Sequence, residues 1–575
     1  MNMLNYIEKA DIPFVPTGIT KEKYIDIIET CLEAYPKDLI LSMNPEEDIQ
    51  AYSRIVCVYS LLTKEGRSGY NADFAYEIMT RCCKAIDCNK KDMKLDFSVK
   101  EIMIAYLLLD SIAPSEIKDN WRSLLSNIVP QKYYVYTTGD KHNINIYNVA
   151  GEWLRTQFDI TSSTEYIEEC LEKQLPKFDE YGMYPDNLAH DPRRNPILYD
   201  LTTRVQLQLL SLYNGKLKPE LDKALERGGL TTLFMQSAAF ELPYGGRSNQ
   251  YLFNESLIAS CCEYEAIRHK NKGNLKVAGA YKRAAHLAIL SIERWLKAKK
   301  HIKNMFESDL IGTESYGYYS KYMITMASFM AIGYITIDDT ITEQPCPAEI
   351  GGYVIETTDR FNKIFANCGG YSIEIDTDAD LHYDATGLGR IHKRGIPTEL
   401  FLSVPCPKNP SYTLPEGLSE GSLTAEVGYI DSNGEVKYLS SASNIEHELT
   451  VLEETSRKVK FQIEYYGDEI PSITQTYTLT DKGIKICAEI DNADKIFYRV
   501  PLLITNGDLP NAFNTEITIG DGFAKCVADK YYAKTETDGY ITKGKEKYGN
   551  RNGIYTYAQI EKTGNTLTLN ISLGD

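Results

Sequence analysis

A predicted turn near the middle of the chain gathers side chains that could bind or transform a ligand. The segment Glu241-Leu-Pro-Tyr-Gly-Gly-Arg-Ser-Asn-Gln250 contains a proline and two adjacent glycines, a composition typical of a turn. Its guanidinium, phenol and amides, with the carboxylate of Glu255 just beyond, suit a hydroxyl-rich anionic ligand. The helix expected to follow would point its free N–H groups at the same place. A tight turn that caps this helix with Ser or Asn also explains the pattern.

A second polar segment, residues 184–204, contains a histidine, three arginines, tyrosines and several aspartates. Its three prolines exclude a long helix before about Ile197, which makes it a loop that leads into a helix. Arg193 and Arg194 alone would be an ordinary solvated pair. Together with His190 and Tyr199 they supply the local positive charge that an anionic ligand needs in a chain of net charge −18.

Three further segments are unusually polar for their setting. Asparagines around Asn148 precede an amphipathic helical pattern, a position where asparagine is also a common helix cap. Residues 316–322 combine aromatic rings and hydroxyl groups, including Tyr319, at the start of a helix, although most tyrosines are packing residues with a satisfied hydroxyl. His382 and Arg390 flank a glycine-containing stretch that suits either a loop or the lining of a cleft between domains.

Composition argues against several classes of function. The acidic balance, with a pI near 5.1, disfavours a nucleic-acid partner. No window of the sequence approaches the apolar run of about 18 residues that a membrane span requires. The N-terminal residues lack the apolar core of a secretory signal, and the 13 cysteines show no C-x-x-C spacing, so we expect a cytoplasmic protein. Neither a metal site nor a cofactor motif stands out, and we expect none.

The pattern of apolar residues changes near residue 345. Before it they recur with helical spacing, and after it they alternate as in strands. The helical runs cover residues 49–62, 99–112, 205–212, 252–267, 275–296 and 319–335, and the strands cover residues 371–375, 423–429, 458–465, 473–479, 484–490 and 566–571. We predict an α+β multidomain chain, with an (α/α) toroid over residues 1–345 followed by an antiparallel β-sandwich over residues 346–575. Periodicity alone does not close the helices into a ring, so a solenoid stays open as an alternative.

Four segments of the sequence resemble the heparinase II/III-like proteins. They are Ala150-Gly-Glu-Trp-Leu-Arg155 with its Asn-rich entry, the 241–250 turn, Tyr318-Tyr-Ser-Lys-Tyr322 and Tyr383-Asp-Ala-Thr-Gly-Leu-Gly-Arg390. The resemblance spans both halves of the chain and looks closest to polysaccharide lyases acting on glucuronate-containing glycans, such as L-rhamnose-α-1,4-D-glucuronate lyase. It implies a toroid followed by a β-sandwich, in agreement with the pattern above, and cleavage of an oligosaccharide by β-elimination. Its motifs are more specific for the architecture than for the sugar.

Elimination from a uronate needs a base for the C5 proton, an acid for the departing oxygen, and donors or cations at the carboxylate. The candidate catalytic residues are His190 and Tyr244, followed by Arg247 and Tyr199. The candidate substrate-binding residues are Arg204, Asn249, Gln250, Asn254, Glu255, Asn148, Tyr319, His382 and Arg390. The expected partner is an acidic oligosaccharide, without nucleic acid or a membrane, and a homo-oligomer is compatible with the sequence.

Two other functions stay open. A glycoside hydrolase of the β-glucuronidase type on the same architecture needs two carboxyl groups that flank the scissile bond. Glu241 and Glu255, with Asp186, Asp191 or Asp200, are the candidates for that pair. A non-catalytic glycan-binding protein needs only aromatic platforms and amides, and has no need of a histidine beside two arginines. The Arg, Tyr, His and amide content of the polar segments favours elimination.

Overall fold

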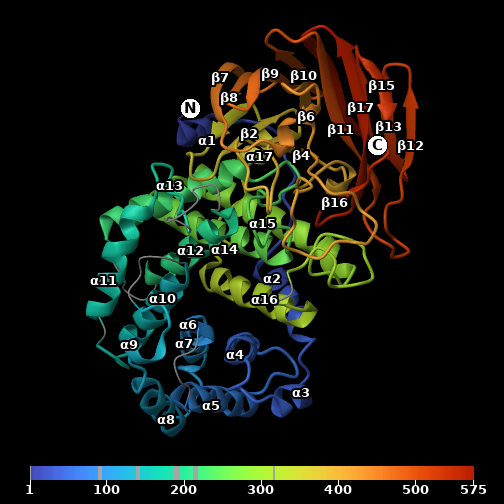
Figure 1. The fold of residues 1–575 in the computed structure, drawn as a ribbon. Helices are drawn as coiled ribbons and strands as arrows, with labels where there is room; N and C mark the ends of the chain where they lie inside the picture. Colours follow the sequence, from blue (N-terminus) through green and yellow to red (C-terminus); the bar gives the residue numbers. More distant parts are fainter. Residues whose placement is uncertain are drawn as a thin grey trace.

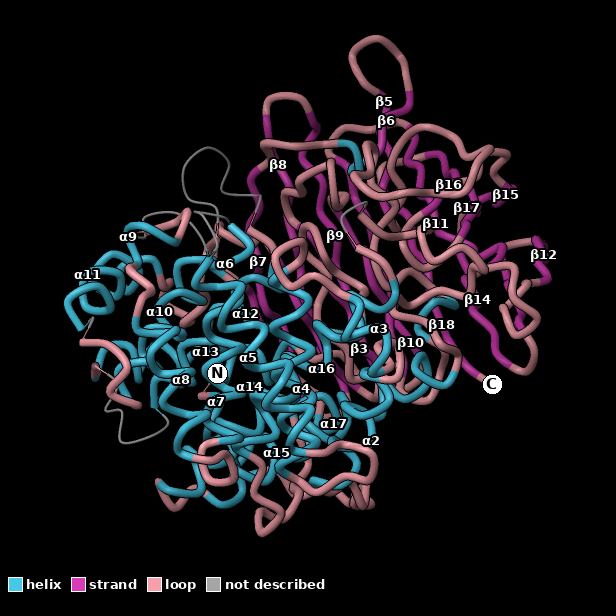
Figure 2. Tube along the Cα trace, turned by 90° about the horizontal axis from the view of Figure 1, so that it is seen from below, coloured by secondary structure: helices cyan, strands magenta, loops and turns pink. Residues whose placement is uncertain are grey.

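Helices form the first part of the chain and strands the second, and Figure 2 shows them gathered on opposite sides of the molecule. The computed structural model describes residues 2–88, 93–137, 143–162, 164–186, 195–211, 218–314 and 317–575. The last long helix, α16, ends at Thr336, and the first strand, β1, begins at Tyr353. The predicted change of secondary structure near residue 345 is therefore confirmed.

Six helices of the described chain form a closed inner ring (Figure 1). They are α4 (Ile49–Lys64), α7 (Ser98–Leu109), α10 (Asn143–Gln157), α12 (Ile197–Gln208), α14 (Leu252–Asn271) and α16 (Tyr319–Thr336). Each contacts the next in this order, and α16 packs back against α4. Helices α4, α7, α14 and α16 are buried almost all round, as expected of helices with neighbours on every side. The predicted toroid is confirmed over the solenoid.

A second set of helices covers the outside of this ring. It consists of α2 (Lys21–Leu32), α5 (Ala72–Cys88), α8 (Ser115–Ser126), α11 (Thr164–Gln174), α13 (Pro219–Met235) and α15 (Leu275–Lys297), with the shorter α1 (Met3–Lys9), α3 (Lys37–Ser42), α9 (Pro130–Tyr133) and α17 (Pro347–Ile350). The short helix α6 (Met93–Asp96) instead packs against α4, α7 and α10 of the inner ring. Most of the long outer helices are amphipathic and bury one face against the ring. Among the described residues, no helix combines the length and apolar composition needed to cross a bilayer.

The strands form three antiparallel sheets. The first has the order β1-β2-β3-β4, with β1 (Tyr353–Glu356), β2 (Lys363–Cys368), β3 (Tyr371–Asp376) and β4 (Gly387–Lys393). The second has the order β12-β13-β14-β18-β10-β9-β8-β7, with β7 (Glu446–Thr455), β8 (Lys458–Gly467), β9 (Ile470–Thr480), β10 (Gly483–Ile490), β12 (Glu516–Gly520), β13 (Phe523–Ala528), β14 (Tyr531–Thr537) and β18 (Thr566–Gly574). The third has the order β15-β17-β11-β5-β6, with β5 (Glu426–Ile430), β6 (Val436–Tyr438), β11 (Lys495–Thr505), β15 (Tyr540–Lys543) and β17 (Ile554–Thr563), and β16 (Tyr548–Gly549) pairs with β17.

The second and third sheets share one hydrophobic core and form the predicted β-sandwich. Strands β8 and β9 alternate between buried and partly exposed residues, so that one face enters the core and the other meets solvent. Tyr477 of β9 and Tyr498 of β11, for example, are both fully buried between the two sheets. The α+β architecture predicted from the sequence is confirmed.

The first sheet lies between the helices and the sandwich, an arrangement the sequence pattern did not predict. Phe365 of β2 packs into the helical core, whereas its neighbours Ile364 and Ala366 pack into the core of the sandwich. Both faces of β2 and β3 are consequently buried. This sheet brings the C-terminal part of the chain against the 241–250 turn.

Candidate active site

The 241–250 segment is an irregular loop between α13 and α14, as predicted. Ser248 and Gln250 have φ angles of 65° and 68°, a left-handed conformation that non-glycine residues adopt only when neighbouring contacts hold it. Gly246 has a φ of 69°, and a Cβ there would lie 2.9 Å from Pro196, so the chain requires glycine at this position. Strained backbone of this kind is concentrated at functional sites.

Hydrogen bonds from three directions hold this conformation. The backbone N–H of Ser248 donates to Glu314 Oε1 at 3.1 Å. Asn254, with its amide oriented to satisfy both neighbours, donates to Ser248 O at 3.3 Å and accepts from Gln250 N at 3.1 Å. Lys303 N donates to Gln250 O at 3.1 Å. The side chain of Asn254 thus acts inside the protein to shape the loop.

Tyr199, Arg247 and Ser248 meet at the edge of the helical ring. Helix α12 begins immediately after Pro196, and Ile197 N donates to Gly245 O at 3.3 Å, so the first turn of the helix contacts the loop directly. Tyr199 lies in that first turn, and its hydroxyl is 3.2 Å from Ser248 Oγ. The Arg247 guanidinium lies 4.9 Å from the centre of the Tyr199 ring. Arg247 is exposed and Tyr199 partly exposed, so part of each side chain lies at the surface.

The groups around Tyr199 have opposite effects on the pKa of its phenol. Burial raises the pKa of the phenol, and the carboxylates of Asp186 and Glu314 raise it further, whereas Arg247 and the Ser248 hydrogen bond lower it. The balance leaves the pKa above its ordinary value, which keeps Tyr199 protonated at neutral pH. A neutral phenol beside an exposed guanidinium can donate a proton while the cation binds an anionic group.

Glu314 joins the loop to the C-terminal part of the chain. Its carboxylate accepts from Tyr251 OH at 2.5 Å and from the Arg551 guanidinium at 2.5 Å. Burial raises the pKa of Glu314, but Arg551 and the other hydrogen-bond donors outweigh this and lower it below its ordinary value. Glu314 is therefore an ionised acceptor that fixes the Ser248 N–H.

Tyr244 lies deeper than Tyr199 and on the opposite side of the loop. Its ring is fully buried, with Lys363 Nζ 3.8 Å from the ring centre. Among the described residues its hydroxyl has no hydrogen-bond partner. Burial raises its pKa well above the ordinary value, an effect that the neighbouring carboxylate of Glu374 increases. No ligand can reach this phenol without a rearrangement of the sheet above it.

Glu241 and Glu255 form a buried cluster with Lys303. The Lys303 ammonium lies 3.0 Å from Glu241 and 2.8 Å from Glu255. Glu255 also accepts from Leu242 N at 3.0 Å. All three charged side chains are at most 2% exposed. One ammonium shared by two carboxylates ties the start of the loop to α14.

Several predicted site residues lie away from the Tyr199 hydroxyl. Arg204 is buried on α12 and forms an ion pair with Asp200 at 2.7 Å. Asn148 is buried on α10 and donates to Asp96 Oδ1 at 3.1 Å and to a backbone oxygen. Tyr319, in the first turn of α16, packs edge-on against His301.

The remaining predictions divide between the first sheet, the loop and the residues outside the described chain. Arg390 on β4 is buried, and its guanidinium lies 3.2 Å from Glu374 and donates to Leu242 O at 2.8 Å. His382 is exposed and contacts the Tyr383 ring. Asn249 donates to Gly246 O at 2.5 Å. His190, together with Asp191, Arg193 and Arg194, lies outside the described residues.

Sequence reasoning missed the residues that hold the loop. Glu314, Lys303 and Arg551 all contact it or its immediate neighbours, yet none stands in a segment with an obvious motif. The Asn550-Arg-Asn-Gly553 run, which ends in an Asn-Gly turn signal, offered the one visible clue.

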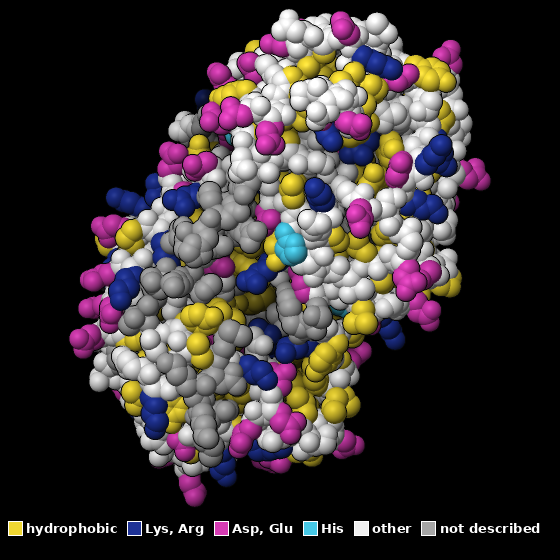
Figure 3. Space-filling view, viewed as in Figure 1, with side chains coloured by type: hydrophobic (Ala, Val, Ile, Leu, Met, Phe, Trp, Pro, Cys, Tyr) yellow, Lys and Arg dark blue, Asp and Glu magenta, His cyan; other side chains and the backbone are white. Residues whose placement is uncertain are grey.

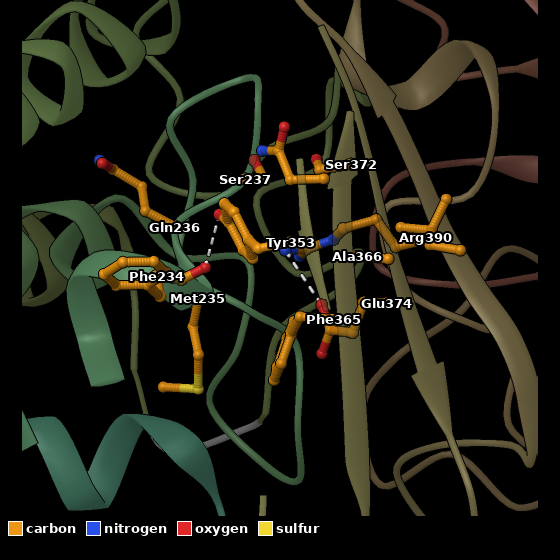
Figure 4. Close-up of a pocket in the computed structure, with 12 residues that line it drawn as sticks. Phe234, Met235, Gln236, Ser237, Tyr353, Phe365, Ala366, Ser372, Glu374 and Arg390 are labelled. Atoms are coloured by element: carbon orange, nitrogen blue, oxygen red, sulfur yellow. Dashed lines mark hydrogen bonds and ion pairs between the residues drawn. The ribbon is translucent and has the colours of Figure 1, made fainter. Parts of the chain in front are cut away.

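Arg390 and Glu374 also line a small cavity between α13 and the first sheet, with Ser237 and Tyr353 (Figure 4). Its volume of about 10 Å³ is near the minimum for one water, so it cannot hold a sugar. Figure 3 shows Lys and Arg side chains at the middle of the face viewed, between the helical and the β parts. Within the described ranges, no group of three or more His, Cys, Asp or Glu side chains is placed to hold a metal ion.

Comparison with protein-family models gives no match, and comparison with curated protein sequences gives none. Solved structures do match. The chondroitin AC lyase of Streptomyces coelicolor A3, in complex with chondroitin sulphate, is 9% identical over 100% of this chain and 82% of its own, with a TM-score of 0.50. Heparinase III is 10% identical over 99% and 88%, with a TM-score of 0.48, and the heparan sulfate lyase of Pedobacter heparinus is 8% identical over 100% and 86%, with a TM-score of 0.46. The predicted resemblance is thus confirmed in the fold, which this chain shares over its whole length with the chondroitin AC lyase structure.

Proposed function

We propose that this protein is a polysaccharide or oligosaccharide lyase that cleaves a glucuronate-containing glycan by β-elimination. The observation that carries the proposal is the exposed Arg247 guanidinium beside the partly exposed, protonated Tyr199 phenol at the edge of the helical ring. This pair offers a cation for a carboxylate and a proton for a leaving group within one side-chain contact. The fold, shared with the structure of a chondroitin AC lyase, supports the same class of reaction.

The proposed step follows from the chemistry of a uronate. A base removes the proton from C5, the electron pair forms the C4=C5 double bond, and the C4–O4 bond breaks. Tyr199 gives its proton to the departing O4, so that the fragment leaves as an alcohol. Negative charge builds on the carboxylate oxygens as the C5 proton leaves, and Arg247 neutralises it. His190 stays the sequence-based candidate for the base.

We assign the acid role to Tyr199 in preference to Tyr244. Both are tyrosines flanking the same loop, but the Tyr244 hydroxyl is sealed beneath β4, where a Cβ added at Gly389 would lie 2.2 Å from it. A proton donor must reach the leaving oxygen within hydrogen-bonding distance. The partly exposed side chain of Tyr199 and its Ser248 partner support this choice.

The described carboxyl groups do not favour the hydrolase alternative. Glu241 and Glu255 share the Lys303 ammonium in the interior, and Asp200 is paired with Arg204. Asp186 is buried and accepts two hydrogen bonds from Asn143 at the start of α10. A glycosidase needs one carboxyl free to protonate the leaving group and another free to act as a nucleophile or base. None of these four is placed in that way.

The test is to incubate the protein with oligosaccharides that contain glucuronate and to follow ultraviolet absorbance. Elimination creates a conjugated C4=C5 unsaturated acid that absorbs, whereas hydrolysis adds water and creates no double bond. New reducing ends with matching absorbance support the lyase. Sugar release without absorbance would assign the hydrolase, and binding without turnover would assign a glycan-binding protein.

A further inference from the structure

A turn from the C-terminal β part penetrates the helical part next to the candidate site. Residues 550–553 connect β16 to β17 at the end of the third sheet. Asn550, Arg551 and Asn552 are at most 2% exposed, which is unusual for a polar turn between two strands. Buried polar groups of this kind have specific partners.

The side-chain hydrogen bonds of Arg551 and Asn552 go to the helical part of the chain, whereas Asn550 Nδ2 donates to Val404 O at 2.7 Å within the C-terminal part. Arg551 Nη1 donates to Gly312 O at 2.6 Å, and Asn304 Nδ2 donates to Arg551 O at 2.9 Å. Gly312 has a φ of 83°, and a Cβ there would lie 2.8 Å from Arg551 O, so the close approach depends on glycine. Asn552 Nδ2 donates to Gln250 Oε1 at 3.1 Å, which adds a direct contact with the loop.

Glu314 connects Arg551 to the loop at the candidate site. The two Arg551 nitrogens lie 2.5 and 3.1 Å from the two Glu314 oxygens, a two-point contact that fixes the carboxylate plane. The same carboxylate accepts the Ser248 N–H at 3.1 Å. Ser248 in turn places its hydroxyl 3.2 Å from that of Tyr199. An unbroken series of contacts therefore runs from the C-terminal part of the chain to the proposed acid.

We propose that Arg551 is a positioning residue, which acts through Glu314 to hold the loop that supplies Ser248 to the site. The backbone of Ser248 is in the left-handed region, and the hydrogen bond from its N–H to Glu314 is one of the contacts that hold it there. Removal of the guanidinium leaves a buried carboxylate without its cation, which must take up a proton or turn away. In either case the acceptor for Ser248 weakens and the loop relaxes. The C-terminal part is thus a component of the active site rather than an accessory.

The catalytic reading of this inference rests on the proposed function, and the experiment separates the two. Arg551→Lys keeps the charge but loses the planar fork, and Arg551→Met loses both. The matched control is Arg155 on α10, also fully buried, which pairs with Glu152 at 2.6 Å and donates to Leu125 O at 2.8 Å. Arg155→Lys and Arg155→Met report the cost of losing a buried Arg–Glu pair elsewhere in the same chain.

The activity test is a double-mutant cycle on the elimination reaction. The Arg551 and Arg155 variants are compared where they lose a similar amount of thermal stability. Arg551→Lys should then lower kcat on the order of 10- to 100-fold, and Arg551→Met should lower it further. The Arg155 variants should keep kcat within about threefold of the wild-type value. In a Ser248→Ala background the Arg551→Lys loss should shrink, because Ser248→Ala already removes the hydroxyl that Arg551 is proposed to hold against Tyr199. Equal kcat losses at Arg551 and Arg155, or full additivity with Ser248→Ala, would overturn the proposal.

A second readout does not require activity. Hydrogen exchange in the peptide spanning residues 241–251 should accelerate in Arg551→Met and stay at the wild-type rate in Arg155→Met. If the wild-type protein forms no unsaturated product from any uronide but this exchange difference is present, the lyase function is wrong and the positioning role stands. If elimination is observed and exchange is the same in all variants, the positioning role is wrong and the function stands.

Discussion

The Glu374 carboxylate accepts a hydrogen bond from the backbone N–H of Tyr244 at 3.2 Å and thereby joins β3 to the loop at the candidate site. Asp384 makes the equivalent contact with Gly246 N at 2.7 Å. The carboxylates of the first sheet therefore act as acceptors for loop N–H groups that no helix or strand could satisfy. Glu374 and Asp384 are both buried, which favours the protonated form of each carboxyl group.

Burial of Glu374 makes stability depend on pH. Burial raises its pKa from 4.5 to about 8, although Arg390 and Lys363 act in the opposite direction. Between these two values the folded protein keeps a proton that the unfolded chain has released, so the free energy of unfolding falls as pH rises. Asp384, whose pKa burial raises to about 7, adds to the same trend. We expect Glu374→Gln, which retains an acceptor for Tyr244 N, to flatten this decline.

Urea denaturation at several pH values between about 5 and 8 measures the trend. The control is Glu464→Gln on the partly exposed face of β8, which should leave the slope unchanged. An identical pH slope for wild type and Glu374→Gln would show that Glu374 titrates normally in the folded state.

Tyr199 and Tyr244 should respond differently to loss of the hydroxyl. Tyr199→Phe removes the proposed acid and should lower kcat by roughly 100-fold or more. Tyr244→Phe removes a buried hydroxyl that has no partner among the described residues, so the free energy of unfolding should change by less than about 1 kcal/mol and kcat by little. Rates from product absorbance and melting temperatures distinguish the two. A large loss of kcat in Tyr244→Phe, with Tyr199→Phe nearly normal, would reverse the assignment.

Much of the fold is readable in the sequence where apolar residues recur along a long helical run or alternate along a strand. Helices α4, α14, α15 and α16 lie within a few residues of their predicted bounds, as do strands β8, β9 and β10. Strands β11 and β7 escaped prediction for opposite reasons. β11 is buried on both faces and β7 is largely exposed on both, so neither shows the alternation that marks a half-buried strand.

The site was only partly predictable, because it depends on contacts between distant segments. The sequence marked the loop and Tyr199 as polar segments, and both are at the site. It could not rank Tyr199 above Tyr244, because both are tyrosines and Tyr244 is buried only by its contacts with the distant first sheet. The Glu314–Arg551 pair joins residues 237 positions apart and lies outside any local pattern. Closure of the ring by the packing of α16 against α4 is likewise a tertiary contact that has no periodic signature in the sequence.

Arg247 should affect turnover far more than stability. Because the side chain is exposed and its contact with the Tyr199 ring is a cation–π contact, Arg247→Ala should change the free energy of unfolding by about 1 kcal/mol. It should lower kcat/KM on uronates by about 100-fold or more, because it removes the cation at the developing charge. Arg247→Lys should lose less, since it keeps the charge without the fork.

A methyl-esterified uronide provides the control for this role. Its carboxyl group is uncharged in the ground state, so the difference between wild type and Arg247→Ala should be smaller than on the free acid. Equal losses on the ester and the acid would mean that Arg247 does not act on the carboxylate. A melting temperature that falls together with kcat would make the residue structural.

Lys303 should be the most sensitive position for stability near the loop. Lys303→Met strands Glu241 and Glu255 in the interior without a counter-charge, and we expect it to cost about 3–5 kcal/mol. The triple variant Lys303→Met, Glu241→Gln, Glu255→Gln removes the uncompensated charges and should recover a large part of that loss. Urea denaturation measures each step. If the single and triple variants are equally unstable, packing rather than charge explains the role of Lys303.

The single variant Glu255→Gln tests the hydrolase alternative. A hydrolase that used Glu255 as a catalytic carboxyl group would lose turnover completely, whereas the lyase should keep most of its elimination rate.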